Sequence, residues 1–137
     1  MQISARVESR RGEHQVTLTT NGQSQTLAIA PKPSGFGSSA NGGELLALAL
    51  ATCYCNDVYR EAAARGITVT GVEVEVDAQF GGAGEPARQI RYRAKVTADA
   101  PEEAIRELIE HTDRVAEVHN TLRSGMAVEL VTAPGAD

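Results

Sequence analysis

The sequence predicts a mixed α+β fold in which antiparallel strands flank one long central helix. Three observations support this prediction: an N-terminal stretch with alternating apolar and polar residues, an Ala- and Leu-rich run, and a second alternating stretch after it. The chain has 137 residues, which is the length of one ordinary domain. We therefore expect a single domain over residues 1–137.

The N-terminal stretch is expected to form an antiparallel β-meander of three strands over about residues 2–30. Asn21-Gly22 separates two of the alternating runs, and Asn-Gly is the strongest short hairpin signal. The apolar positions of the three runs are Ile3, Ala5, Val7, Val16, Leu18, Leu27 and Ile29. A loop rich in Pro, Gly and Ser follows at residues 31–43; it is either a surface linker or a segment that brings backbone close to an active site.

Residues 44–65 predict the central helix, because they contain neither Gly nor Pro and are rich in Ala and Leu. Residues 45–55 are apolar on nearly every side, and a helix of this kind is typically buried all round. The second half of the run regains polar faces, and Gly66 is well placed to end the helix.

Residues 67–97 predict a β-hairpin. Val72, Val74 and Val76 alternate with acidic residues, and the returning strand alternates apolar residues with Arg91, Arg93 and Lys95. The two outer faces therefore carry opposite charges, and cross-strand pairs between them should fix the register.

Two shorter helices and a final strand complete the predicted fold. Asp99-Ala100-Pro101-Glu102-Glu103 is expected to open the first helix, with Pro101 at its first position. The second helix is expected over about residues 113–120. Met126, Val128 and Leu130 alternate with other residues and predict the last strand.

Composition excludes several functions. Lys plus Arg number 13 against 18 for Asp plus Glu, and only five residues are aromatic, so we expect no nucleic-acid partner. The longest apolar run is too short to cross a bilayer, and the N-terminus lacks the pattern of a secretory signal. We expect no membrane association and a cytoplasmic location, where Cys53 and Cys55 would be free thiols.

The two cysteines are the candidates for chemistry. Residues two apart on a helix point about 200° away from each other, so a Cys53–Cys55 disulfide is not expected while the helix is intact. A buried free cysteine is also common as a small apolar residue without a role in chemistry. The three histidines, at 14, 111 and 119, are scattered, so the sequence predicts neither a metal site nor a cofactor.

Two segments resemble the OsmC/Ohr family of thiol-dependent hydroperoxide reductases. The first is Gly42-Gly43-Glu44-Leu45-Leu46-Ala47-Leu48-Ala49-Leu50-Ala51-Thr52-Cys53, which is similar to the family's Asn-Pro-Glu-x-Leu-type entry into a central helix with a reactive cysteine. The second is Glu117-Val118-His119-Asn120-Thr121-Leu122, which is similar to the end of the family's Cys-Pro-Val-x-x-Thr-Leu stretch. The resemblance implies an OsmC-like fold that forms an intertwined homodimer, with the cysteine sites at the subunit interface.

The resemblance also implies roles for individual residues. Cys53 matches the cysteine that attacks the peroxide and becomes a sulfenic acid, in a response to oxidative stress. Arg10 or Arg11 is the nearest match to the arginine that holds the thiolate, because a nearby cation lowers a thiol pKa. Glu44 lies one position after the family's catalytic glutamate, whose place is taken by Gly43.

One departure bears directly on mechanism, because Ala116 stands where the family has its second, resolving cysteine. Three interpretations follow. Cys53 could reduce organic or other hydroperoxides with an external thiol as resolver, which is the reading that we favour. The scaffold could instead bind a small apolar or electrophilic ligand at the dimer cleft without catalysis. Finally, Cys55 could replace the resolver after local unwinding of the helix.

Overall fold

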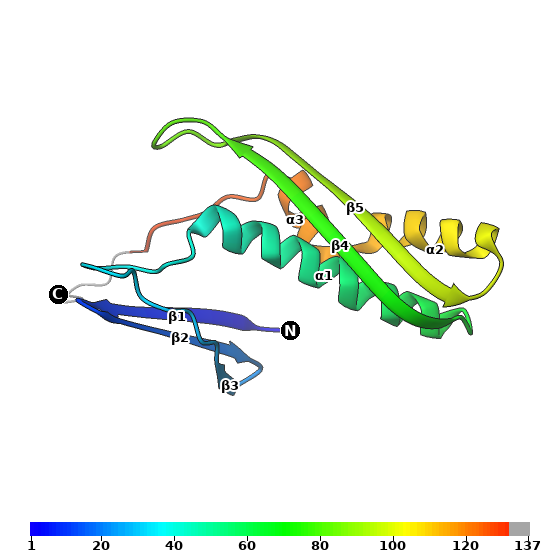
Figure 1. The fold of residues 1–137 in the computed structure, drawn as a ribbon, viewed down its shortest axis with the longest axis horizontal. Helices are drawn as coiled ribbons and strands as arrows, with labels where there is room; N and C mark the ends of the chain where they lie inside the picture. The colour runs from blue at the N-terminus through cyan, green and yellow to red at the C-terminus, as the bar shows by residue number, and fades with distance from the viewer. Residues whose placement is uncertain (132–137) are drawn as a thin grey trace. The chain divides into compact units, whose positions relative to one another are not determined.

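The computed structural model describes residues 1–131 as antiparallel strands and three helices, so the α+β prediction is confirmed (Figure 1). The chain divides into two compact units, Met1–Leu45 and Leu46–Asp137. Within the described residues, no helix is both long enough and apolar enough to span a membrane.

The first unit contains the predicted meander. Its sheet has the order β1-β2-β3, and both pairs are antiparallel. Asn21 and Gly22 form the tight turn before β3 with positive φ angles of 48° and 82°, as their sequence predicts. The strands are β1 (Ile3–Arg10), β2 (Glu13–Thr20) and β3 (Gln23–Thr26).

The third strand is shorter than expected. Leu27 and Ile29 lie beyond its end, although the Leu27 amide still donates a hydrogen bond to the Val16 carbonyl (3.1 Å). After this bond the chain leaves β2, and Pro31 instead pairs with Ser38 in an isolated bridge. The apolar alternation therefore continues to Ile29, although β2 pairs with this segment no further than Leu27.

Helix α1 (Gly42–Ala64) is the predicted central helix. Its start is fixed by a reciprocal cap, in which the Glu44 amide donates to Asn41 Oδ1 (2.8 Å) and the Asn41 amide donates to Glu44 Oε1 (2.9 Å). Gly66 follows its end with a φ of +66°, which a side chain would disfavour.

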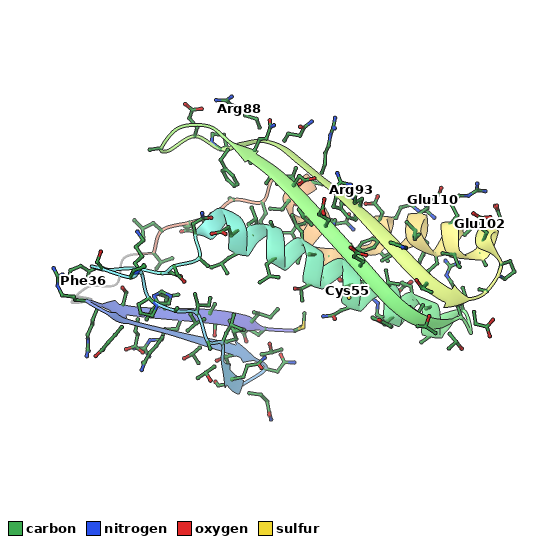
Figure 2. The ribbon with its side chains drawn as sticks, viewed as in Figure 1. Phe36, Cys55, Arg88, Arg93, Glu102 and Glu110 are labelled. Carbon is green, nitrogen blue, oxygen red and sulfur yellow. The ribbon has the colours of Figure 1, made fainter. Side chains whose placement is uncertain are left out.

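The second unit contains the predicted hairpin, formed by β4 (Thr68–Phe80) and β5 (Ala87–Asp99). Its register places Glu73 opposite Lys95, Glu75 opposite Arg93 and Asp77 opposite Arg91, so the expected pairing of charges is confirmed. Arg93 bonds to both Glu75 and Asp77 on this exposed face. Figure 2 shows Arg93 on β5, and Glu102 and Glu110 on the helix that follows the hairpin.

The last two helices are α2 (Glu102–Val115) and α3 (Glu117–Arg123). Pro101 precedes the first turn of α2 rather than forming part of it, because its ψ of 148° is not helical. Helix α2 continues through Asp113, where a new helix was expected. The break falls at Ala116, whose extended backbone (φ −71°, ψ 114°) separates the two helices.

The core of the second unit lies between the hairpin and the helices (Figure 1). The valines of β4 and the apolar residues of β5 turn one face of the hairpin toward α1 and α2. The buried residues at its centre are Tyr54, Val58, Ala62, Val96 and Leu108. This packing holds the second half of α1 in place, and with it the residues around Cys53.

One prediction is wrong. Residues 126–131 form no strand; Val128 is fully exposed, because alternation alone does not provide a neighbouring strand with which to exchange hydrogen bonds. In the first half of α1, Leu48 is 55% exposed. Complete burial of this half stays a prediction, tied to the expected homodimer.

Candidate active site around Cys53

Cys53 lies in the middle of α1 and is partly buried. One helical turn later, Asp57 points to the same side, and the thiol donates to its Oδ2 across 3.6 Å. The Oε1 atom of Glu117, at the start of α3, lies 3.9 Å from the same sulfur. The thiol thus faces two carboxylates from two helices.

Arg60 orients both carboxylates. Its Nη1 atom lies 3.1 Å from Asp57 Oδ1 and donates to Glu117 Oε2 across 2.8 Å, while its Nε donates to Glu61 (2.9 Å). Each carboxylate therefore has one oxygen on Arg60 and its other oxygen toward the sulfur. We call Cys53, Asp57, Arg60 and Glu117 the thiol cluster.

The thiol cluster favours the protonated thiol. Burial raises the pKa of Cys53, and the charges of Asp57 and Glu117 raise it further, while the backbone amide of Val118 opposes them. Burial, followed by a hydrogen bond to Glu117, also raises the pKa of Asp57 to about 6, against the influence of Arg60. The pKa of Glu117 is lowered, first by its own backbone amide and then by Asp57.

The same atoms are close enough to contact one cation. Cys53 Sγ and one carboxylate oxygen each from Asp57 and Glu117 lie within 4.8 Å of one another. Arg60 already places a positive charge against both carboxylates. We therefore interpret the cluster as a thiol with its acid–base partners rather than as a metal centre.

Glu44 has a structural role in this chain, since it caps α1 through Asn41. It precedes Cys53 by nine positions on α1 and belongs to the first unit, whereas Cys53 belongs to the second. A role for Glu44 at Cys53 stays a prediction.

Arg10 and Arg11 belong to the first unit, at the turn between β1 and β2. Arg10 is paired across the strands with Glu13, and the Arg11 guanidinium lies 4.9 Å from the centre of the Phe36 ring. Their role as the cation of the site stays a prediction. Within the second unit, Arg60 reaches the carboxylates rather than the sulfur.

Cys55 and Ala116 are the two positions that bear on whether a second cysteine could resolve an oxidised Cys53. Both cysteines are free thiols, and Cys55 is two residues past Cys53 on the intact helix, so it points elsewhere. Ala116 is completely buried and immediately precedes Glu117, whose side chain contacts the thiol. The expected position of a resolving cysteine is therefore next in sequence to a member of the thiol cluster.

Sequence reasoning missed Asp57, Arg60 and Glu117 as partners of the thiol. The spacing of positions 53, 57 and 60 puts all three on one stripe of a helix, and this signal could have found Asp57 and Arg60. Glu117 is 64 residues from Cys53, and only the packing of α3 brings it there.

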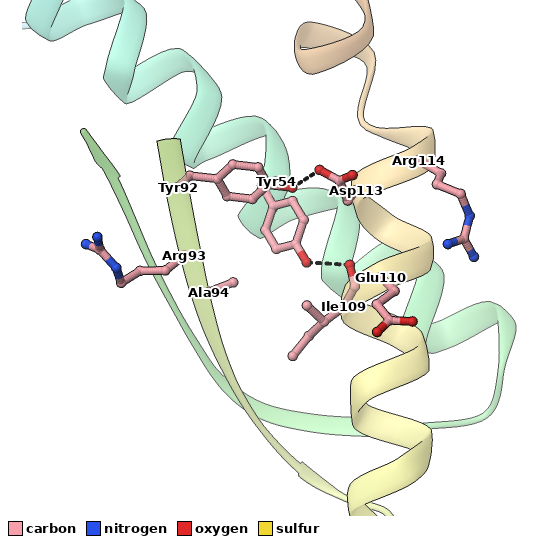
Figure 3. Close-up of a pocket in the computed structure, with 8 residues that line it drawn as sticks. All are labelled: Tyr54, Tyr92, Arg93, Ala94, Ile109, Glu110, Asp113 and Arg114. Carbon is pink, nitrogen blue, oxygen red and sulfur yellow. Dashed lines mark hydrogen bonds between the residues drawn. The ribbon is translucent and has the colours of Figure 1, made fainter. Parts of the chain in front are cut away.

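A separate cavity of about 450 Å³ lies between β5 and α2 (Figure 3). Two hydrogen bonds join residues of its lining: the Tyr54 hydroxyl donates to the Ile109 carbonyl (2.8 Å), and the Tyr92 hydroxyl donates to Asp113. The lining residues are Tyr54, Tyr92, Arg93, Ala94, Ile109, Glu110, Asp113 and Arg114, and Cys53 is not among them.

The fold and the thiol cluster define a class of α+β proteins that carry a thiol on a central helix beside a long hairpin. The chain belongs to the OsmC-like protein family, because the sequence profile of that family matches residues 35–131.

Solved structures agree with this assignment of the fold. An OsmC-like protein from Mycoplasma pneumoniae has 22% identity and a TM-score of 0.61, over 88% of this chain and 87% of that chain. The organic hydroperoxide resistance protein OhrB of Bacillus subtilis has 18% identity and a TM-score of 0.52, over 88% and 90%. No curated protein sequence matches the chain.

Proposed function

We propose that this protein reduces organic hydroperoxides through Cys53 and that an external thiol completes the cycle. The observation that carries the proposal is the position of Cys53: a partly accessible thiol on the central helix of an OsmC-like fold, held against two oriented carboxylates. Similar structures include proteins described by their organic hydroperoxide resistance.

The cycle uses one cysteine of this chain. Sulfur of Cys53 attacks the terminal oxygen of the hydroperoxide, the O–O bond breaks, and an alcohol and a sulfenic acid result. Two external thiol molecules then reduce the sulfenic acid to the thiol, and they leave as a disulfide with water. Cys55 takes no part, because it points away on the same helix.

Location of the oxidised sulfur tests the proposal. After one equivalent of cumene hydroperoxide and trapping with a sulfenic-acid reagent, mass spectrometry should find the adduct on Cys53. The Cys55→Ser variant should give the same adduct and serves as the matched control. An adduct on Cys55 alone would assign the reactivity to the wrong thiol.

The proposed assembly is a homodimer, supported by the exposed apolar surface of α1 around Leu48. Sedimentation equilibrium at micromolar concentration should give twice 14.5 kDa for the wild type. The Leu48→Glu variant should shift toward the single chain. A wild-type mass of one chain would contradict the assembly.

The proposed cation of the assembled site is Arg10 or Arg11. Replacement of the contributing arginine by Met should raise the Cys53 pKa and slow its alkylation near neutral pH, because a cation stabilises the thiolate. Unchanged rates in both single variants would remove the arginines from the site.

A further inference from the structure

We propose that Asp57 is the proton relay of Cys53: its Oδ2 accepts the thiol proton as sulfur attacks the peroxide, and returns that proton to the departing alkoxide. The inference rests on the proposed peroxide reduction and assigns a catalytic residue within the same site. Asp57 contacts the reacting sulfur itself, at 3.6 Å.

The geometry singles out Asp57 rather than Glu117. Asp57 lies on the same rigid helix as Cys53, its side chain is only 8% exposed, and Arg60 fixes its other oxygen. The Glu117 side chain is 59% exposed and lies slightly further from the sulfur, at 3.9 Å. Glu117 shares a hydrogen bond with Asp57 and helps to keep a proton on the pair.

A proton relay explains how Cys53 can attack a peroxide although its neighbouring carboxylates disfavour the thiolate. Two carboxylates beside a sulfur oppose formation of a free thiolate, which the attack on peroxide would otherwise need. General base catalysis avoids this intermediate, because the proton leaves sulfur only as the S–O bond forms. A carboxyl group with a pKa of about 6 is well matched to accept and return a proton near neutral pH.

The step balances without another reactant. The S–H proton moves to Asp57, the new S–O bond forms, and the electron pair of the broken O–O bond stays on the alkoxy oxygen. That oxygen takes the proton from Asp57 and leaves as the alcohol. Sulfur loses two electrons, the peroxide gains two, and Asp57 ends in its starting state.

The relay predicts a distinctive pH profile for oxidation of the Cys55→Ser protein. Oxidation by cumene hydroperoxide should be nearly flat from about pH 6.5 to 8.5, because thiol and carboxylate coexist between their two pKa values. Alkylation by iodoacetamide needs only thiolate, so its rate should rise about tenfold per pH unit over the same range. Within the second unit, the charged groups that face the sulfur are Asp57 and Glu117, with Arg60 behind them; the proposed Arg10 or Arg11 would lower the Cys53 pKa and shorten the flat range from its alkaline end.

Asp57→Asn in the Cys55→Ser background keeps the shape of the side chain but removes the relay. Alkylation should become faster, because a negative charge is lost beside the thiol. Oxidation should fall about 100-fold relative to alkylation, a typical size for a general acid–base contribution. Its remaining rate should rise with pH in parallel with alkylation. Glu117→Gln is the matched control: it removes a second charge beside the thiol, so alkylation should become faster, whereas oxidation should keep its nearly flat pH profile because Asp57 is still present.

The outcomes separate the two proposals. No oxidation of wild-type Cys53 at any pH would overturn peroxide reduction and the relay together. Oxidation that follows thiolate formation in the Cys55→Ser protein, or an unchanged ratio of the two rates after Asp57→Asn in that background, would overturn the relay and leave peroxide reduction standing. The pH profile of the Cys55→Ser protein decides the question even where the Asp57→Asn variant folds poorly.

Discussion

Cys53 and Asp57 lie one turn apart on α1, with 3.6 Å between the sulfur and a carboxylate oxygen that Arg60 leaves free. A catalytic thiolate is usually stabilised by a cation, whereas this thiol is in contact with anions. The described second unit therefore presents Cys53 as a thiol that must lose its proton during the reaction.

The first prediction concerns resting reactivity. Because burial raises the pKa of Cys53, its alkylation at pH 7 in the Cys55→Ser protein should be slower than that of free cysteine. Rates measured from pH 6 to 10 should place its pKa above the ordinary value for a cysteine thiol. A pKa below that value would show that another group supplies a dominant cation.

Tyr92→Phe tests the polar contacts inside the second unit. The Tyr92 hydroxyl donates to Asp113, which also binds Arg123 across 2.7 Å. We expect urea unfolding to show a loss of about 1–2 kcal/mol, because a partly buried carboxylate loses its donor. Tyr59→Phe, at an exposed tyrosine of α1, is the control and should change stability little. An equal loss of unfolding free energy in both variants would contradict a stabilising role for the hydrogen bond between Tyr92 and Asp113.

His119 gives a pH dependence of stability. Its ring is buried against Tyr92 (4.7 Å between centroids), and burial lowers its pKa. His119 therefore binds a proton more readily in the unfolded chain than in the folded one. The free energy of unfolding should not depend on His119 protonation above about pH 6.5, and it should decrease as the pH falls below that value. In His119→Phe this part of the loss should disappear from denaturation curves between pH 7 and 5. A variant with the wild-type pH profile would show that His119 does not contribute.

Ala116→Cys tests the position of the absent resolver. Wild-type protein treated with one equivalent of hydroperoxide should form no intramolecular disulfide, because its two thiols diverge on one helix. The introduced thiol should form a disulfide with Cys53, since Ala116 precedes the residue whose side chain contacts that sulfur. Non-reducing peptide mapping distinguishes the outcomes. A Cys53–Cys55 bridge in the wild type, or no new bridge in the variant, would contradict this placement.

Local patterns predicted most of the fold. The opposite charges of β4 and β5 predicted pairing between their outer faces, and the structure places Glu73 opposite Lys95. The expected last strand failed because Met126, Val128 and Leu130 have the right alternation but no strand beside them in the described residues. Strand formation depends on a partner, which the pattern within one segment does not contain.

The candidate site was predictable only in part. Cys53 was predicted because it ends the segment that resembles the OsmC/Ohr family. Asp57 and Arg60 could also have been predicted, since their spacing places them on the same side of the helix as Cys53. Glu117 could not be predicted, because its contact depends on where the chain breaks at Ala116 and how α3 packs. The resemblance implies a catalytic role for Glu44, which stays a prediction; the cap that its side chain forms with Asn41 was not predicted.

Steady-state consumption of cumene hydroperoxide with a small dithiol as reductant tests the central claim most directly. The account predicts many turnovers per chain for the wild type and for Cys55→Ser, and none above background for Cys53→Ser. Turnover should stop when the dithiol is omitted, because no other reductant returns the oxidised sulfur of Cys53 to the thiol. Wild-type turnover that survives in Cys53→Ser would contradict the account.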